Sequence, residues 1–561
     1  MLTFFYSIDD DIQPRGKNAV TLAAASNDVA SAPAAWSAQR FLALGCTLLI
    51  GCMLAIVTFR SLSDQLWSDE LLTTNLLTAA NLPKLWAGIE LGIDGNPPFY
   101  LTAAWLLTRP LPDIISPIVL LKLINVVLAA AGVAALWHMA RRIVTVNACW
   151  IGSVLFVSLG DAFIYAASEL RTYALYFLVA ALAVLCQQRL VERRRPIDVV
   201  LLALAFTCLA MAHTFGIVYV GCIALAGWLS QPRGGRLLLP LIALAVLPAV
   251  FAILAWTPFL MEQLKVAKPY NWMMAPGLPD LFDILFGSDM MLWLSALEAC
   301  CLAAAGVSHV REHGLRLQPI LHDPQWQSVR FVALVSAGFT AFTCTGWLFS
   351  QVAFPLYVAR FFTPQVFTSF ALHAAFGEWL LRYGRERRTM VLAISAVVAP
   401  LMARNAVLHA NSSTHGKPIC ADASGVFFES AFVHGDLPVM VDSPHMFLPR
   451  MTYAAHGDAY RYPLDWDVVL NYPDRSRGNA VDFHIMQGLR EWKPMPQVET
   501  TDEIVRKYPQ FLVVEQPYRA WFSNIVATRQ VTAEKLAETT PTGSDEIACT
   551  LWKVTRVSPR P

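Results

Sequence analysis

The stretch FLALGCTLLIGCMLAIVTF, residues 41–59, runs for nineteen positions without a charged residue. A helix that crosses a bilayer needs about 20 apolar residues, so this stretch predicts a transmembrane span. Apolar stretches of similar length recur along the chain, which is 56% hydrophobic and only 15% charged over its 561 residues. Such a composition is far from that of soluble domains and predicts a polytopic membrane protein.

Ten further apolar segments complete a set of eleven candidate spans. They lie near residues 116–138, 144–160, 173–186, 198–212, 215–229, 237–256, 290–308, 331–348, 364–381 and 389–408. Another apolar piece, FYLTAAWLLTRPL at 99–111, is too short to cross comfortably and is expected to form an interfacial or re-entrant helix. The sequence thus predicts an all-α membrane domain over 41–408, with a long first outer loop over 60–115.

Lysine and arginine are distributed unevenly between the two sets of loops. With a cytoplasmic N-terminus, the inner segments hold 18 Lys and Arg residues and the outer loops hold seven. The positive-inside rule therefore predicts an inner N-terminus and an outer C-terminus. Residues 1–40 lack a continuous apolar core and are expected to be a mobile cytoplasmic tail. The formal net charge of +1 gives no sign of a nucleic-acid partner.

Residues 409–561 have ordinary polarity and form a separate predicted domain. The strand-like runs LPVMVDS, FLVVEQ and CTLWKVT alternate with helix-compatible stretches such as DEIVRKY, which favours a small α/β domain outside the membrane. Of the eleven cysteines, only Cys420 and Cys549 lie in this domain. An oxidising compartment would favour a disulfide between them, and two unpaired buried thiols are the alternative.

Polar residues that are unusual in a membrane domain collect in the predicted outer loops. They are Asp69 and Glu70 in LWSDELLTT, Asp94 and Asn96 in IDGNPPFYL, Glu169, Arg171 and Tyr173 in YAASELRTYALY, His213 in MAHTFG, and Arg360 in FPLYVARFFTP. Structural interpretations exist for each: the acidic pair can start a helix, the arginines can snorkel beside tyrosines, and the histidine can cap a span. An outer arginine can also hold a lipid phosphate through its planar fork of donors.

The order and shared membrane face of these motifs resemble the C-type (GT-C) glycosyltransferase superfamily, whose members use polyprenyl-phosphate-linked sugars. The motifs are WSDE after the first span, DGNPPFYL about 25 residues later, SELRTYAL before the fourth span and YVARFFTP before the tenth. The resemblance in motifs covers roughly residues 40–410. For the C-terminal domain it is limited to the presence of an outer α/β domain after the last span. Its bacterial branch includes lipid A aminoarabinose transferases and core galacturonosyltransferases, and protein O-mannosyltransferases are more distant members.

The resemblance implies that Asp69 is the catalytic base, with Glu70 its neighbour, and that Arg171 and Arg360 hold the lipid phosphate. Asp94 and Asn96 match positions that line the same cavity. We group Glu169, Tyr173 and His213 with them as substrate-binding residues. Some relatives carry Lys or His where this chain has Asn96, so the donor sugar stays open.

The expected activity is transfer of a sugar from a polyprenyl phosphate to a hydroxyl of an envelope lipid, glycan or protein. It would take place at the outer side of a bacterial inner membrane. A phosphate leaving group needs no acid, so one carboxylate base and cations on the phosphate suffice, unlike the two carboxylates of glycosidases. This chemistry predicts inversion at the anomeric carbon. A divalent cation would fit if Asp69, Glu70 and Asp94 converged, although no spacing requires one.

Two other classes of function compete with this interpretation. A transporter or lipid flippase would place ionisable residues within the membrane, and Lys122, Glu298, His373 and Glu378 are the main candidates. None of the four is matched in a second half of the chain, as a repeat transporter would require. A membrane-anchored sensor or assembly factor would instead work through residues 409–561.

Overall fold

The computed structural model describes most of the chain. The described residues are 32–110, 114–231, 238–267, 275–286, 289–313, 326–353, 355–383, 388–411, 419–421, 425–471, 480–516, 519–529, 531–539 and 548–557. Most of the predicted N-terminal tail, residues 1–31, lies outside this set, and the first helix already begins at Ala32 within the remainder of that tail.

In the described residues between 32 and 411, the regular secondary structure of the membrane domain consists of helices. In chain order they are α1 (Ala32–Ser63), α2 (Ser68–Leu77), α3 (Leu82–Glu90), α4 (Phe99–Thr108), α5 (Pro117–Ala140), α6 (Val146–Leu159), α7 (Asp161–Ser168), α8 (Tyr173–Arg193), α9 (Pro196–Ala212), α10 (Gly216–Leu229), α11 (Leu238–Ala267), α12 (Leu278–Phe286), α13 (Asp289–His313), α15 (Gln327–Val352), the 3₁₀ helix η5 (Ala359–Gln365), α16 (Val366–Tyr383) and α17 (Arg388–Asn411). Each of the eleven predicted spans coincides with one of these helices.

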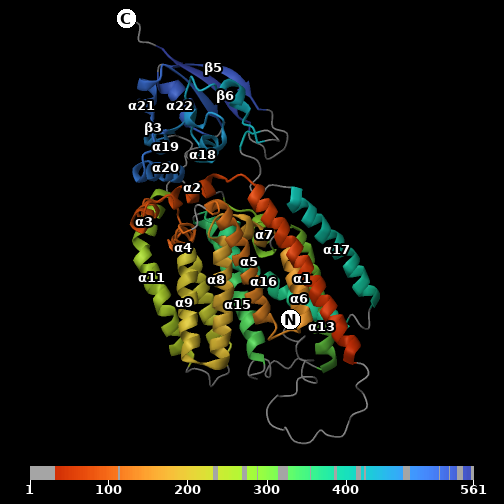
Figure 1. The fold of residues 1–561 in the computed structure, drawn as a ribbon. Coiled ribbons are helices and arrows are strands. Elements are labelled where there is room, and N and C mark those ends of the chain that lie inside the picture. Colours follow the sequence, from red (N-terminus) through yellow and green to blue (C-terminus); the bar gives the residue numbers. More distant parts are fainter. Residues whose placement is uncertain are drawn as a thin grey trace, which may run out of the picture.

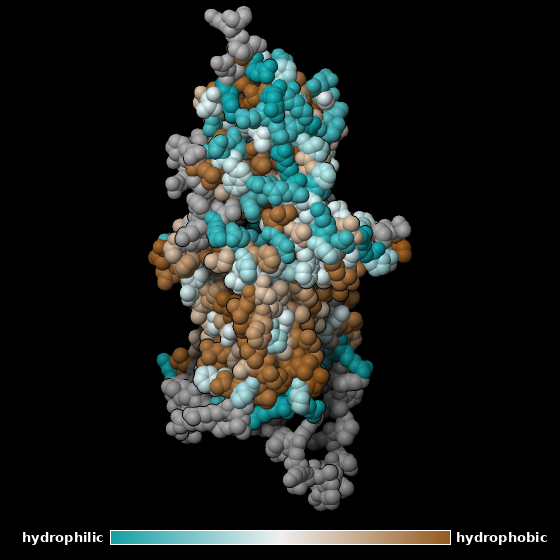
Figure 2. Space-filling model, turned by 90° about the vertical axis from the view of Figure 1, so that its left-hand side faces the viewer, coloured by the Kyte–Doolittle hydropathy of each residue, from teal (hydrophilic) through white to brown (hydrophobic). Residues whose placement is uncertain are grey.

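Five of these helices are by themselves long and apolar enough to cross a membrane, and the count rises to seven if two bent pairs each form one span. One bent pair is α6 with α7, which meet at 70°. Helix α4, at ten residues, is about half as long as a span requires, as predicted for an interfacial helix. On the face drawn in Figure 2, the helical part of the molecule is mainly apolar and the C-terminal domain is mainly hydrophilic. The protein is therefore a multi-pass membrane protein.

Helices α2, α3 and α4 occupy the long first outer loop predicted between the first two spans. They lie at the end of the helix bundle nearest to the C-terminal domain (Figure 1). Helix α18 of that domain (Pro444–Tyr453) contacts α2, and helix α20 (Ala480–Trp492) contacts α3. The first outer loop is thus enclosed between the membrane helices and the C-terminal domain.

The C-terminal domain is a six-stranded sheet with helices packed against it. Its remaining elements are η6 (Phe428–Phe432), β1 (Val439–Val441), η7 (Gly457–Ala459), β2 (Tyr460–Leu464), α19 (Trp466–Asn471), β3 (Val498–Thr500), α21 (Thr501–Lys507), β4 (Gln510–Glu515), α22 (Trp521–Thr528), β5 (Val531–Glu538) and β6 (Thr550–Arg556). The strand order is β3-β2-β1-β4-β6-β5, with β3, β2, β1 and β4 parallel and the last two strands antiparallel. The predicted α/β domain is confirmed, and the order in which strands are added reverses at β1, with β2 on one side of it and β4 on the other.

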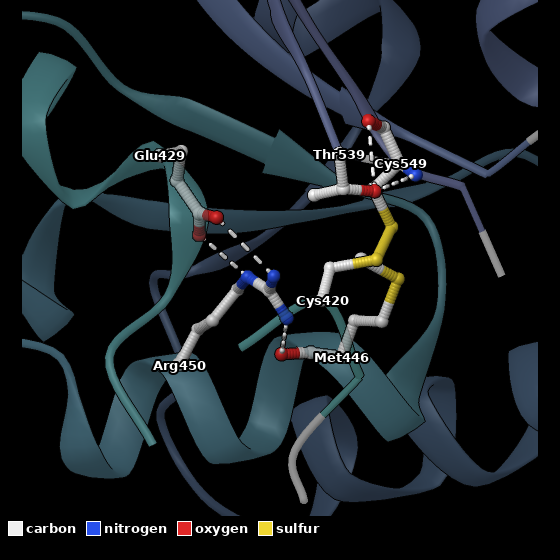
Figure 3. Close-up of a disulfide and its surroundings, with 6 residues drawn as sticks. All are labelled: Cys420, Glu429, Met446, Arg450, Thr539 and Cys549. Atoms are coloured by element: carbon white, nitrogen blue, oxygen red, sulfur yellow. Dashed lines mark hydrogen bonds and ion pairs between the residues drawn. A yellow bond between two sulfur atoms is a disulfide. The ribbon is translucent and has the colours of Figure 1, made fainter. Parts of the chain in front are cut away.

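Cys420 and Cys549 form a disulfide, with their Cα atoms 6.2 Å apart. It joins the first described residues of the C-terminal domain to the start of β6. Beside it, Arg450 of α18 forms a fully buried ion pair with Glu429 (Figure 3). Of the two alternatives that the sequence left open, the structure therefore has the disulfide.

We expect the Cys420→Ser variant to unfold at a lower temperature than the wild type. The bond closes a loop with a sequence separation of 129 residues, and loss of such a crosslink typically costs about 2–5 kcal/mol. Thermal unfolding of the detergent-purified protein measures the effect, with Cys52→Ser at an exposed free cysteine of α1 as control. An unchanged midpoint in Cys420→Ser would show that the bond does not stabilise the folded domain.

Candidate active site

Glu70 fixes the start of α2. Trp67 is the N-cap residue of this helix, and its backbone N–H donates to Oε2 of Glu70 at 3.2 Å. The other oxygen, Oε1, accepts the backbone N–H of Leu170 at 2.6 Å. Burial raises the pKa of Glu70, and the two backbone hydrogen bonds offset part of this rise. With both oxygens engaged and 2% of the residue exposed, Glu70 ties α2 to the segment that carries Glu169 and Arg171.

Asp69 lies between two arginines. Its Oδ2 is 3.4 Å from Nη2 of Arg360 and 4.0 Å from Nη2 of Arg171. The two guanidinium groups favour the ionised carboxylate. The Asp69 side chain is 19% exposed, whereas that of its neighbour Glu70 is buried. Of the two adjacent carboxylates, Asp69 is therefore the one that a substrate can reach.

Arg171 makes three contacts within the protein through its Nη1. Its Nη1 donates to Oδ2 of Asp94 at 2.8 Å, to the backbone oxygen of Asp69 at 3.2 Å and to Oγ1 of Thr73 at 3.3 Å. The other oxygen of Asp94 accepts the backbone N–H and the side-chain amide of Asn96 at 2.8 and 3.0 Å. Arg171 thereby joins α2 to the turn before α4.

Arg360, in η5, is the more available cation. Its Nη1 donates to the Tyr165 hydroxyl at 3.5 Å, and its guanidinium lies 5.0 Å from the centre of the Trp67 ring. The Nε atom is buried and has no hydrogen-bond partner within the described part of the chain. A phosphate oxygen would satisfy such a donor.

Glu169 is fully buried beside these charges. Neither of its carboxyl oxygens has a hydrogen-bond partner among the residues that the structure describes. Burial raises its pKa to about 8, although the nearby guanidinium groups of Arg360 and Arg171 act in the opposite direction. Glu169 is therefore protonated at neutral pH and adds no negative charge beside Arg360.

We expect Glu169→Gln to remove a pH dependence of stability. In the unfolded chain this carboxyl ionises near its ordinary value of 4.5, whereas in the folded protein it stays protonated up to about pH 8. Between these values the unfolded state binds fewer protons, so the wild type loses stability as pH rises. Unfolding midpoints of both proteins from pH 5 to 8 should diverge as pH rises, with the variant falling less.

The exposed Glu90→Gln in α3 is the matched control and should follow the wild type. Parallel pH profiles for the wild type and Glu169→Gln would contradict the raised pKa.

Tyr173 and His213 form the apolar wall next to the charged residues. The His213 ring stacks on Tyr176 with centroids 4.9 Å apart and lies 6.2 Å from the ring of Tyr173. Burial, aided by Arg171 and Arg360, lowers the pKa of His213 to about 3. Its imidazole is therefore neutral, and its Nδ1 accepts the backbone N–H of Phe215 at 3.1 Å. The His213 ring can pack against a substrate, but it carries no positive charge.

A cation site is not formed by the three carboxylates considered above. In the described ranges, no group of three or more His, Cys, Asp and Glu side chains converges on one point. Glu70 binds backbone N–H groups, and Asp94 binds Arg171 and Asn96. These residues do not fit a divalent cation, and we derive no step through one.

The whole chain resembles a known enzyme structure. Two crystal structures of ArnT from Cupriavidus metallidurans match it, one bound to undecaprenyl phosphate and one in the apo state. They superpose with TM-scores of 0.50 and 0.51, at 12% sequence identity. The matches cover 90% and 91% of this chain and 98% of the ArnT chain. The chain has the fold of ArnT. No protein-family model and no curated protein sequence gives a significant match.

ArnT is an aminoarabinose transferase with the GT-C glycosyltransferase fold, which is the superfamily that the motifs resemble. Because nearly the whole ArnT chain is covered, the shared fold includes both the membrane helices and the C-terminal domain. At this level of identity the likeness shows the fold and assigns no residue. The roles of the site residues rest on the geometry described above.

The four polar residues that suggested a transporter are all paired within this ArnT-like fold. His373 and Glu298 bind each other at 2.8 Å, and both are fully buried. Glu378 accepts hydrogen bonds from the backbone and hydroxyl of Thr145 and pairs with Arg382. Lys122 donates to the backbone oxygens of Ser61 and Asp64. These contacts tie the four side chains to neighbouring parts of the helix bundle.

Several residues at the site were not predicted. Asn125 in α5 donates to the backbone oxygen of Glu169 at 2.6 Å and so supports the Glu169 segment. Trp67 and Tyr165 flank Arg360, and His445 of the C-terminal domain contacts the residue before Asp69. The aromatic residues beside the motifs were a usable signal for Trp67 and Tyr165. His445 carried none, because it lies 377 positions from its partner Ser68.

Proposed function

We propose that the protein is an integral-membrane glycosyltransferase that moves a sugar from a polyprenyl-phosphate donor to a hydroxyl acceptor. The observation that carries this proposal is the accessible Asp69 carboxylate paired with Arg360 and, at longer range, Arg171. The ArnT-like fold supports it, since one ArnT structure holds undecaprenyl phosphate. A single carboxylate beside two guanidinium groups matches the needs of a glycosyl phosphate as donor.

Arg360 would bind the donor phosphate. In a polyprenyl phosphosugar this group is a phosphodiester with one negative charge, and it becomes a monoester with more charge as the sugar leaves. Arg360 therefore binds the departing phosphate more strongly than the bound donor, which is the condition for lowering the barrier. Phosphate on Arg360 also competes with Asp69 for the guanidinium and so frees the Asp69 carboxylate.

Asp69 would act as the general base. It takes the proton of the acceptor hydroxyl as that oxygen attacks the anomeric carbon from the face opposite the phosphate. The bond from the anomeric carbon to the phosphate oxygen breaks, and its electron pair leaves with the lipid phosphate. One displacement of this kind inverts the anomeric configuration.

The other site residues hold this pair in place. Arg171, Asp94 and Asn96 connect α2 to the turn before α4, and Glu70 connects α2 to residue 170. We assign them to positioning rather than to proton transfer, because their polar atoms are engaged within the protein. Tyr173 and His213 would form an uncharged wall beside the donor. Because Glu169 is neutral, it would not repel the donor phosphate.

We further propose that the site faces the outer side of a bacterial inner membrane, with the C-terminal domain outside the cytoplasm. The disulfide between Cys420 and Cys549 supports this orientation, because such bonds persist in oxidising compartments. The excess of Lys and Arg in the predicted inner loops agrees with it. Acceptors at this side include envelope lipids, glycans and proteins.

Mass spectrometry of envelope lipids, glycans and proteins tests the proposal in cells. A strain with the gene should carry a glycosylated envelope component that the deletion strain lacks, and Asp69→Asn should behave like the deletion. Identical envelope profiles in the presence and absence of the gene would contradict the proposed function.

A further inference from the structure

Helix α18 of the C-terminal domain rests on the residues directly before Asp69. Nδ1 of His445 and the hydroxyl of Ser68 share a hydrogen bond at 2.5 Å, and the His445 ring stacks on Trp67 with an interplanar angle of 8°. At the other end of α18, the hydroxyl of Tyr453 accepts the backbone N–H of Leu66 at 2.9 Å. Both ends of one helix thus hold residues 66–68.

These three residues set the geometry of the proposed site. Ser68 is 2% exposed and immediately precedes Asp69. Trp67 caps α2 and supports the Arg360 guanidinium with its ring. A change in the position of Trp67 or Ser68 would therefore move Asp69 and Arg360 relative to each other.

His445 lies beside a group of polar residues of the C-terminal domain, of which Asp482 of α20 is the nearest. Oδ1 of Asp482 lies 4.0 Å from Nε2 of His445. Arg519 donates through Nη2 to Oδ2 of Asp482 at 3.2 Å and to the hydroxyl of Ser443 at 3.1 Å. Ser443 follows β1 and Arg519 follows β4, so both lie at the carboxyl ends of two adjacent parallel strands. In open α/β sheets, functional groups collect at this edge, where the strand order reverses.

Helix α18, which carries the His445 imidazole, is held firmly within the C-terminal domain. Arg450 in the last turn of α18 donates from Nε and Nη2 to both oxygens of Glu429, at 2.6 and 3.2 Å, and neither side chain is exposed. Tyr460 of β2 donates to the same carboxylate at 3.0 Å. The disulfide lies beside this ion pair (Figure 3). The C-terminal domain therefore presents His445 in a fixed position.

We propose that His445 is a positioning residue of the glycosyl-transfer site, through which the C-terminal domain orients Asp69 and Arg360. The assignment rests on the proposed function. It makes the C-terminal domain part of the catalytic machinery, although it contributes no reacting group. Helix α18, through His445 and Tyr453, provides the mechanical connection to residues 66–68.

The test measures transfer kinetics and binding of undecaprenyl phosphate for full-length His445 variants. His445→Ala should lower kcat about tenfold or more, because small displacements of reacting groups cost large factors in rate. Its Kd for undecaprenyl phosphate should rise by less than the loss in kcat. His445→Asn, which keeps an acceptor for Ser68, should recover part of kcat, whereas His445→Phe, which keeps only a ring, should recover less.

Ser68→Ala supplies an independent variant if His445→Ala does not fold. It should reproduce the loss in kcat, and the double variant should lose no more than His445→Ala alone, because both changes remove the same contact.

The exposed His456→Ala in the same domain is the control and should match the wild type. His445→Ala with wild-type kcat, or additive effects of the two changes, would overturn the inference while leaving the proposed function intact. A wild type that neither binds undecaprenyl phosphate nor transfers sugar would instead contradict the proposed function itself.

Discussion

Replacing Asp69 with Asn is expected to lower the rate of sugar transfer by about 10²–10⁴-fold while the protein remains folded. The amide keeps the size and one acceptor oxygen of the carboxylate but cannot take the proton of an acceptor hydroxyl. Arg360 also loses its charged partner in this variant, so the affinity for undecaprenyl phosphate should stay the same or increase. Loss of turnover with retained lipid binding is the signature of a missing base.

The comparison requires turnover and binding on the same preparation of each variant. Glu90→Gln in α3 is the control, since it removes an exposed carboxylate from the same outer segment. Glu70→Gln should behave differently from Asp69→Asn, with reduced stability as well as reduced rate, because Glu70 holds two backbone N–H groups. Wild-type turnover in Asp69→Asn would exclude this residue as the base.

Replacing Arg360 with Ala is expected to weaken binding of undecaprenyl phosphate by about 10–100-fold. Hydrogen bonds to charged groups contribute about 1.5–3 kcal/mol, and each 1.4 kcal/mol is a factor of ten in affinity. The rate with bound donor should fall as well, since removal of one donor that stabilises developing charge costs about 10²–10³-fold. Arg360→Lys should recover part of the binding through its charge, but not the bidentate contact.

Two further arginine variants distinguish direct binding of the phosphate by Arg360 from a general effect of positive charge. Arg109→Ala removes an exposed arginine from the first outer loop and should leave the affinity unchanged. Arg171→Ala should destabilise the fold, because this side chain links α2 to Asp94. Equal affinities of the wild type and Arg360→Ala for undecaprenyl phosphate would remove Arg360 from the phosphate site.

The membrane fold was predictable because bilayer spans leave long apolar segments in the sequence. All eleven predicted segments are helices, and the short apolar piece at 99–111 forms the ten-residue helix α4. The bend of 70° between α6 and α7 was not predictable. Gly160 marks the break locally, but the angle is set with α7 packed against α1, α5 and η5, which are distant in the sequence.

The composition of the site was partly predictable for a related reason. Charged residues in apolar surroundings are conspicuous, so Asp69, Arg171 and Arg360 stood out, and the shared membrane face predicted that they meet. Which of these residues can act on a substrate, and which ones hold the fold together, depends on tertiary contacts. The backbone N–H of Leu170 makes Glu70 a structural residue, and contact with Asp94 occupies Arg171.

The role of the C-terminal domain depended entirely on the three-dimensional arrangement. The strand-like runs predicted its sheet, but the contact of His445 with Ser68 joins residues 377 positions apart. His445 stands in the segment SPHMFLPR, and nothing in that segment indicates a site. Only the docking of α18 onto α2 shows it.

The most direct test of the central claim follows the fate of a polyprenyl phosphosugar labelled in its sugar. Purified protein in proteoliposomes is incubated with this donor and an envelope extract as source of acceptor. We predict that the label moves to an acceptor, with release of polyprenyl phosphate and inversion at the anomeric carbon, and that Asp69→Asn abolishes the transfer and the release. Movement of intact labelled donor across the bilayer, with no release of polyprenyl phosphate, would contradict this prediction and identify a transporter.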